Sequence, residues 1–242
     1  MAINKINMRY FDINFVNTNH LGYKKWGRRY ARITRLSKGG GKKDSFDVAF
    51  NKELITWEKI IQTLLSRVVL EDKNRILQYR TQSGSAQYRE IDFIAKLKDR
   101  MVLCEIKLKQ VYKDKIGDSR SGWKQLNKSI DISCHKYSNI AGLAICVDMS
   151  FLYGIDCIID DDVYCKYNNI KKYFDIASSE KKIIWLNSLD MAKLAVKLSL
   201  ISIDEVESMK RIFNEKNNPL STLKEDNNIS ENKPFKALLK KI

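Results

Sequence analysis

The chain has 242 residues, of which 44% are hydrophobic and 30% are charged, and it carries a formal net charge of +15. This balance is typical of a soluble globular protein with one sizeable domain and an appendage, or with two small domains. The chain has only 2 prolines and 10 glycines, which argues against a fibrous or disordered protein. Because no apolar run is long enough to cross a membrane and the start MAINKINMRYFD lacks a signal-peptide core, we expect a cytoplasmic protein without membrane contact.

The first fifty residues are predicted to form a basic N-terminal extension. Residues 1–23 contain the loosely alternating stretch YFDINFV, which is typical of one or two strands. The next segment, YKKWGRRYARITRLSKGGGKKD, mixes aromatic with cationic residues and ends in a Gly/Lys loop. Residues 1–50 hold 11 Lys or Arg against 3 Asp, a net charge of +8. Codon bias in an AT-rich genome explains the lysines but explains the arginines less well.

This basic extension is predicted to contact a polyanion. A positive field of this strength favours nucleic acid first and an anionic membrane second. Because Trp26 and Tyr30 lie among the cations, we favour contact with a phosphate backbone over a merely solvated charged face. The candidate residues are Lys24, Lys25, Arg28, Arg29, Arg32, Arg35, Lys38, Lys42 and Lys43.

A helix and three strands are predicted to follow. Apolar residues recur at helical spacing over 51–71, at Leu54, Trp57, Ile61, Leu64, Leu65 and Val68. Strand-like runs then cover 75–82, 89–98 and 100–109. The short KDR turn predicts that the last two of these strands form a hairpin.

The rest of the chain is predicted to complete a mixed α/β core over residues 51–187. SGWKQLNKSIDISCHKY (121–137) predicts a helix with Ser121 as its N-cap, and the continuous apolar run IAGLAICVD (140–148) predicts a buried strand. GIDCIIDDDVYC and KKIIWLN are expected to add edge strands. Residues 188–216 predict one or two helices, and 217–242 predict a loose tail.

The predicted hairpin carries charged residues where apolar ones are expected. Glu105 and Lys107 are two residues apart in a strand, so they share a face, while the residues between and around them point into the packing. With the turn centred near Asp99, Asp92 pairs with a residue near 106, so Asp92 and Glu105 meet at one end of the ribbon. Two carboxylates placed so closely repel each other, and each raises the pKa of the other. A hard divalent cation such as Mg²⁺ or Mn²⁺ would remove this repulsion.

This pattern resembles the PD-(D/E)xK phosphodiesterase superfamily, the restriction-endonuclease-like fold. The family places an Asp on the second core strand and (D/E)-x-K on the third, here Asp92 and Glu105-Ile106-Lys107. Its order of helix, three strands, helix and strand is matched over roughly residues 51–148, and EID stands where the PD dipeptide would be. Glu71-Asp72-Lys73 and Glu180-Lys181-Lys182 also fit the short motif, but they lie in polar segments.

The resemblance implies roles for further residues. An acid on the first helix is expected, with Glu58 better placed than Glu53. Some branches carry a glutamine at the start of the helix after the motif, where this chain has Gln125. The metal ligands implied are Asp92, Glu105 and the main-chain carbonyl of Ile106, and Lys107 would position or deprotonate the attacking water or stabilise charge on the phosphate.

Each candidate residue also has a simpler explanation that involves no catalysis. For Glu105 and Lys107 the alternative is a cross-strand ion pair on a solvated face, and Glu58 and Gln125 are ordinary surface helix residues on that view. His20 and His135 are expected to be structural rather than general bases, and Asp160, Asp161 and Asp162 to form a solvated acidic turn rather than a second metal cluster. The five cysteines, Cys104, Cys134, Cys146, Cys157 and Cys165, are expected to be buried thiols in a reducing compartment.

The function expected from the resemblance is metal-dependent phosphodiester hydrolysis, with Mg²⁺ or Mn²⁺ as cofactor and DNA favoured over RNA. Such nucleases act in restriction, recombination, repair and mobile-element defence, and the fold alone does not choose among these. The alternatives are a nucleic-acid-binding module with a vestigial site and an accessory subunit that acts in a larger complex or as a homodimer. The absence of a G-x-x-x-x-G-K-[ST] motif indicates that any motor would be a separate protein.

Overall fold

The computed structural model describes residues 9–37, 45–109, 122–150, 164–178, 180 and 182–217. They form a mixed α/β protein with two sheets. Strands β1 (Phe11–Val16), β2 (Ile76–Arg80) and β3 (Ala86–Glu90) form an antiparallel sheet in that spatial order. β1 confirms strand structure within residues 1–23, and it joins the N-terminal segment to strands of the predicted core.

The second sheet has the order β4-β5-β6-β7. Its strands are β4 (Phe93–Lys96), β5 (Met101–Lys109), β6 (Ile140–Asp148) and β7 (Ile183–Asn187). β4 and β5 form the predicted antiparallel hairpin, whereas β6 is parallel to both β5 and β7. Every residue of β6 is buried, which confirms the buried strand expected from its apolar run.

Helices cover both faces of this second sheet. The helices are α1 (Leu21–Ser37), α2 (Ser45–Ser66), α3 (Trp123–Cys134), α4 (Ile170–Asp175), α5 (Ser188–Lys197) and α6 (Ile203–Asn217), with a 3-10 turn η4 (Tyr167–Asn169) before α4. One core cluster packs α2, α4, α5 and α6 against residues such as Cys104 and Ile106 of β5. A second cluster packs α3 against Leu103 and against Leu77 and Tyr79 of β2.

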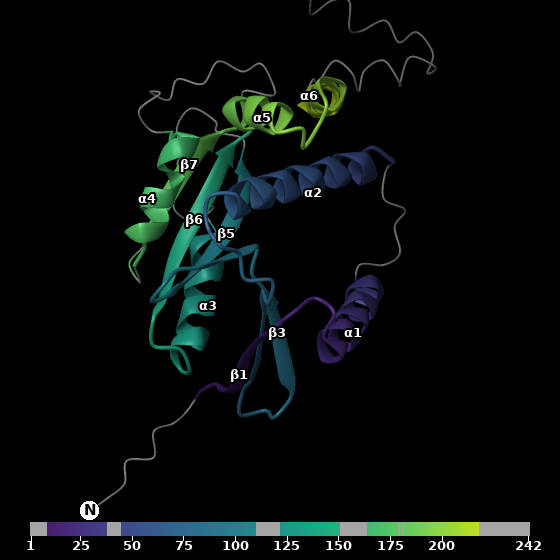
Figure 1. Ribbon diagram of the computed structural model, residues 1–242. Helices are drawn as coiled ribbons and strands as arrows, with labels where there is room; N and C mark the ends of the chain where they lie inside the picture. Colours follow the sequence, from purple (N-terminus) through teal and green to yellow (C-terminus); the bar gives the residue numbers. More distant parts are fainter. Residues whose placement is uncertain are drawn as a thin grey trace, which may run out of the picture.

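The three-stranded sheet lies between two helices. Figure 1 shows α1 beside β3, on the far side of that sheet from α3. The alternation along β3 explains this arrangement: Tyr88 faces the aromatic rings of α1, whereas the Arg89 Nε donates to Ser129 Oγ of α3 at 3.1 Å. The helix α1 is therefore packed against the sheet by apolar and aromatic contacts.

Several boundaries differ from those expected from the sequence. The predicted strand over 89–98 is two strands, because the chain passes from one sheet to the other at Ile91 and Asp92. The predicted helix 51–71 begins at Ser45 and ends at Ser66, so α2 crosses the boundary drawn between residues 50 and 51. Residues 188–216 form two helices that contribute Met191 and Met209 to the first core cluster.

Other expectations fall partly or wholly outside the described residues. Of the edge strand predicted in 154–165, Tyr164 makes an isolated parallel bridge to Trp185, and 154–163 lie outside the description. The second predicted edge strand is present as β7. The predicted tail beyond Asn217 also lies outside the described residues. None of the helices in the described part of the chain is long and apolar enough to cross a bilayer.

Candidate active site

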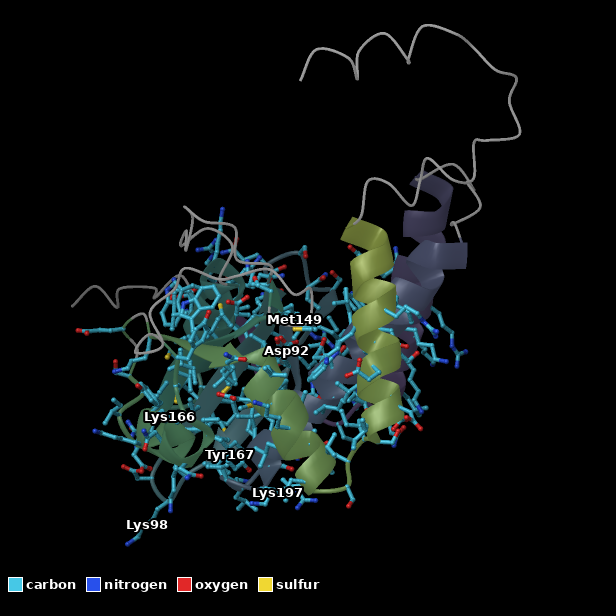
Figure 2. The ribbon with its side chains drawn as sticks, turned by 90° about the horizontal axis from the view of Figure 1, so that it is seen from above. Asp92, Lys98, Met149, Lys166, Tyr167 and Lys197 are labelled. Atoms are coloured by element: carbon cyan, nitrogen blue, oxygen red, sulfur yellow. The ribbon has the colours of Figure 1, made fainter. Side chains whose placement is uncertain are left out.

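The β4–β5 hairpin brings Asp92 and Glu105 together. Phe93 pairs with Cys104, and the turn closes with the Leu97 amide donating to the Arg100 carbonyl at 2.9 Å. Continued by one residue, this register sets Asp92 opposite Glu105. The Asp92 Oδ2 accepts a hydrogen bond from the Ile106 amide at 2.7 Å, so the carboxylate closes the end of the ladder. In Figure 2, Asp92 lies toward the middle of the molecule, whereas Lys98 of the hairpin turn extends outward.

Glu105 and Lys107 form a paired acid and base on one face of β5. The Lys107 Nζ lies 2.5 Å from the Glu105 Oε1, and Glu105 is only 8% exposed. Cys104 and Ile106 point to the opposite face and pack in the first core cluster. The alternation expected for this strand is therefore present, and the charged pair lies on the side of the sheet that α3 covers.

The main-chain carbonyl of Ile106 faces the same side of β5 as Asp92. In an extended strand the N–H and C=O of one residue point to the same side. Because the Ile106 amide donates to Asp92, its carbonyl is also directed toward that edge. The Asp92 and Glu105 carboxylates and this carbonyl supply an all-oxygen donor set, which suits a hard divalent cation. Among the residues that the structure describes, no group of three or more His, Cys, Asp or Glu side chains is arranged to hold a metal ion.

The charges at this site perturb one another. Burial, followed by the charge of Glu105, raises the pKa of Asp92 to about 7, although the Ile106 amide and Lys107 act in the opposite direction. Burial alone would lower the pKa of Lys107, but the hydrogen bond and charge of Glu105, with Asp92 and Glu58, raise it. Lys107 is therefore kept protonated as an ammonium. The surroundings of Asp92 favour the neutral, protonated form of its carboxyl group.

Helix α2 brings Glu58 toward the same group. Burial and the charge of Glu90 raise the pKa of Glu58, and the charges of Lys107 and Glu105 also act on it. The Gln62 Nε2 donates to the Glu58 Oε1 at 3.1 Å and holds the side chain. Glu53 lies five residues closer to the N-terminal end of α2, about 7 Å along the helix axis. Glu58 therefore lies within electrostatic range of Lys107 and Glu105.

Helix α3 begins directly against the Glu105–Lys107 pair. Its N-cap is Gly122, with a φ of 78°, so the prediction that Ser121 caps this helix is wrong. A Cβ at position 122 would lie 2.6 Å from the Glu105 Cγ and 2.8 Å from the Lys107 Cε. The glycine is therefore needed both for its backbone conformation and for the close approach of α3 to the charged pair. Gln125 lies in the first turn of α3 with an exposed side chain, and its carbonyl accepts from Arg89 at 2.9 Å.

Gly122→Ala is expected to impair the site more than it destabilises the fold. The added methyl group would push the Glu105 and Lys107 side chains apart, in addition to a backbone strain of about 1–2 kcal/mol at positive φ. Gly84→Ala is the matched control, because Gly84 has the same φ of 78° and open space around its missing Cβ. Both variants should unfold at a lower temperature than wild type, Gly122→Ala the more so because only position 122 adds a clash to the strain, and any activity of the candidate site should fall only in Gly122→Ala. Equal activity in the two variants would show that contact with Gly122 does not position the pair.

A polar network fixes the break between β3 and β4. The Arg75 guanidinium donates to the Asp92 carbonyl at 2.9 Å and lies 3.2 Å from the Glu90 Oε1. Glu90 in turn accepts from the Tyr23 hydroxyl of α1 at 3.0 Å. Burial, and then the charge of Glu90, raise the pKa of Tyr23 to about 12, so this hydroxyl remains a donor. Arg75, Glu90, Tyr23 and Gly122 were not predicted from the sequence, because their roles depend on contacts between distant segments.

The predicted nucleic-acid-binding residues lie largely on α1. Trp26 stacks with Tyr30 at 5.4 Å and contacts Tyr88 of β3 at 5.9 Å between ring centroids. The rings of Tyr23 and Trp26 thus face the sheet, Tyr30 is exposed and stacks on Trp26, and exposed cations occupy the opposite side of the helix at Lys24, Lys25, Arg28 and Arg29. Positions 32 and 35 continue this side at helical spacing, although the side chains of Arg32 and Arg35 and the whole of Lys38, Lys42 and Lys43 fall outside the description.

Both histidines make contacts within the protein, and three of the four described cysteines are buried. His20 accepts from the Tyr23 amide at 3.4 Å, and the His135 ring contacts Tyr10. Cys104, Cys146 and Cys165 are buried free thiols, as expected. The prediction of a buried thiol is wrong for Cys134, which is exposed at the C-terminal end of α3. Cys157 and the acidic turn of Asp160, Asp161 and Asp162 lie outside the described residues.

Comparisons with protein-family models and with curated proteins identify no relative. The chain matches no protein-family model, and a search of curated proteins gives no significant match. The resemblance to the PD-(D/E)xK superfamily therefore depends on the residues and geometry of this chain alone.

Proposed function

We propose that this protein is a metal-dependent nuclease of the PD-(D/E)xK type that hydrolyses phosphodiester bonds in DNA. The observation that carries the proposal is the convergence of Asp92 with the Glu105–Lys107 pair at the end of the β4–β5 ladder. A partly buried site with two carboxylates and an ammonium is costly for the apo protein unless a cation and an anionic substrate complete it.

The order of elements supports the same proposal. Helix α2 is followed by β2, by the divided strand β3 and β4, by β5, by α3 and by β6. The order agrees with the helix, three strands, helix and strand of the resemblance when β3 and β4, which belong to different sheets, are counted as the one strand predicted over 89–98. Asp92 lies where the second strand divides, and Glu105 and Lys107 lie on the third.

In this mechanism, Asp92, Glu105 and the Ile106 carbonyl would hold Mg²⁺ or Mn²⁺. The cation would lower the pKa of a bound water and neutralise charge that develops on the phosphate. Lys107, kept protonated by Glu105, would orient the attacking water or stabilise the phosphate oxygens. Glu58 would accept a hydrogen bond from a water molecule at the α2 side of the site, and the close approach of the Gly122 backbone would keep Glu105 and Lys107 in place.

The proposal is tested by incubating the purified protein with supercoiled, linear and single-stranded DNA and with RNA, each with Mg²⁺, with Mn²⁺ or with EDTA. We expect cleavage of DNA that requires the divalent ion, in a cytoplasmic protein that acts as a homodimer or within a larger complex. Binding of DNA without cleavage under every metal condition would instead support the accessory or vestigial alternative.

Helix α1 is proposed to hold the phosphate backbone of the substrate. Replacing Arg28, Arg29, Arg32 and Arg35 by glutamine should flatten the log–log salt dependence of duplex DNA binding by about two to four units, since each phosphate contact contributes about −0.9. The loss should be similar for unrelated sequences, because phosphate contacts do not read bases. The matched control replaces four exposed lysines outside α1, Lys166, Lys171, Lys172 and Lys193. An α1 variant with the wild-type slope would show that this helix does not bind the backbone.

A further inference from the structure

A basic groove runs beside α3, on the side of the three-stranded sheet away from α1. Two hollows of about 520 and 560 Å³ adjoin there, because both are lined by Arg9, Tyr10 and Lys128. The first reaches the β2–β3 turn at Thr81 and Ser83. The second follows α3 toward Cys134. Together the two hollows form one continuous groove between the β2–β3 turn and helix α3.

The charge of this groove suits an anionic chain. Arg9, Lys124 and Lys128 contribute three cations, against the single carboxylate of Asp131. All three cationic side chains are exposed. The turn adds the hydroxyl groups of Thr81 and Ser83, which lie 2.8 Å apart. Arginine, lysine and hydroxyl groups are the usual partners of phosphate oxygens in nucleic-acid complexes.

The walls of the groove are fixed relative to each other. The Arg89 guanidinium of β3 donates to Ser129 Oγ at 3.1 Å and to the Gln125 carbonyl at 2.9 Å. These hydrogen bonds join the β2–β3 hairpin to α3. Leu77 and Tyr79 of β2 pack with Leu126 and Ile130 of α3 in the second core cluster. The cations are therefore presented by two elements that are already docked, which limits the ordering cost of binding.

The groove also lies a short distance from the candidate active site. Gly122, at the start of α3, contacts Glu105 and Lys107, and Lys128 follows six residues later, about 9 Å along the helix. A strand of duplex DNA advances about 3.4 Å per nucleotide. Along the axis of α3, Lys128 thus lies about three nucleotide steps from Gly122, which adjoins the proposed site.

We propose that this groove binds the sugar–phosphate backbone of the nucleic-acid strand adjoining the scissile bond; the position of that bond rests on the proposed nuclease function. Helix α1 and helix α3, which lines the groove, lie on opposite sides of the three-stranded sheet (Figure 1), so α1 and the groove are separate contact surfaces. Their contributions to binding are expected to add, because they share no side-chain contact among the described residues that form them.

The test combines Arg9→Gln, Lys124→Gln and Lys128→Gln in the full chain, without metal. Binding of labelled duplex DNA, single-stranded DNA and RNA is measured by fluorescence anisotropy over a range of salt concentrations. We expect the salt slope for duplex DNA to flatten by about two to three units, and affinity at low salt to fall at least tenfold. The double variant Lys124→Gln, Lys128→Gln should lose about two units. It also keeps the contact of Arg9 with the Tyr10 ring, should that contact prove necessary for folding.

The matched control carries Lys166→Gln, Lys171→Gln and Lys193→Gln, which remove the same charge outside the groove. A groove variant whose slope equals that of wild type, or falls no more than that of this control, would overturn the proposal. An equal loss of binding to polyglutamate would also overturn it, because the groove would then be a general site for acidic chains. Binding through the groove without any cleavage would remove the nuclease proposal and leave the groove. Cleavage by the wild-type protein, together with an unchanged salt slope in the groove variant, would remove the groove proposal and leave the nuclease proposal.

Discussion

Asp92→Ala, Glu105→Ala and Lys107→Ala are each expected to reduce metal-dependent DNA cleavage by about 10³-fold or more. The three side chains act on one centre: two hold the cation and the third orients the water or the phosphate. The folded structure should be retained in all three variants, with a lower Tm in Glu105→Ala and Lys107→Ala because each leaves its partner charge unpaired. Single-turnover cleavage rates measured at saturating Mg²⁺ give the size of each loss.

The chain supplies its own control for this experiment. Glu71-Asp72-Lys73 has the same short motif, and its Glu71 and Lys73 are also paired, but Lys73 is 80% exposed. Glu71→Ala and Lys73→Ala should leave cleavage within a fewfold of wild type. Full activity in any of the three site variants, or an equal loss in these controls, would remove the proposed site.

Metal should stabilise the protein, and the effect should depend on pH through Asp92. The pKa of this carboxyl rises from 3.8 in the unfolded chain to about 7 in the apo fold, chiefly through burial and then through Glu105. Below pH 3.8 the carboxyl group of Asp92 is protonated in both the folded and the unfolded state, so it does not lower the free energy of unfolding. Between the two values the folded state holds a proton that the unfolded state has lost, so stability falls as pH rises and the loss is complete above about 7. A shift of this size corresponds to about 4 kcal/mol at most.

Asp92→Asn is therefore expected to stabilise the apo protein at pH 8 while abolishing its response to metal. Saturating Mg²⁺ or Mn²⁺ should raise the Tm of wild type at pH 8 by several degrees, since ligand at 100 times its Kd adds about 2.7 kcal/mol. Asp99→Asn, at the exposed hairpin turn, should leave both properties unchanged. Differential scanning calorimetry across pH 4 to 8, with and without metal, measures both effects. A metal-induced shift that persists in the Asp92→Asn, Glu105→Gln double variant would place the metal elsewhere.

The central strands could be predicted closely because their signal is local. The apolar runs over 100–109 and 140–148 correspond to β5 and β6 within one residue. Burial on both faces leaves such segments little choice of structure. The charged residues within β5 were prominent for the same reason, since Glu105 and Lys107 interrupt a pattern that packing would otherwise fill.

The division of the second strand could not be predicted from local sequence. REIDFIAKLK alternates well enough for one strand, and the break at Ile91 and Asp92 depends on Arg75, which binds the Asp92 carbonyl from seventeen positions away. Helix α1 was also missed as a helix, although Tyr23, Trp26 and Tyr30 recur at helical spacing. Its apolar side is made of aromatic rings that pack on Tyr88, a contact that only the folded sheet supplies.

Gly122 illustrates the same limit within the candidate site. A Ser-Gly-Trp sequence before a helix favours serine as the cap, and the structure instead uses the glycine at positive φ. The reason is the close approach of α3 to Glu105 and Lys107, which leaves no room for a side chain. The acids and the lysine could be found from their spacing in the strand, whereas the residues that position them required the tertiary contacts.

The decisive measurement is the conversion of supercoiled plasmid by wild-type protein that has been stripped with EDTA and then titrated with Mg²⁺, beside an Asp92→Asn preparation treated identically. We expect no conversion in EDTA, conversion to nicked or linear DNA as Mg²⁺ is restored, and none at any Mg²⁺ concentration with Asp92→Asn. Conversion that continues in EDTA, or that is restored equally in Asp92→Asn, would contradict a metal-dependent nuclease site at the end of the β4–β5 hairpin.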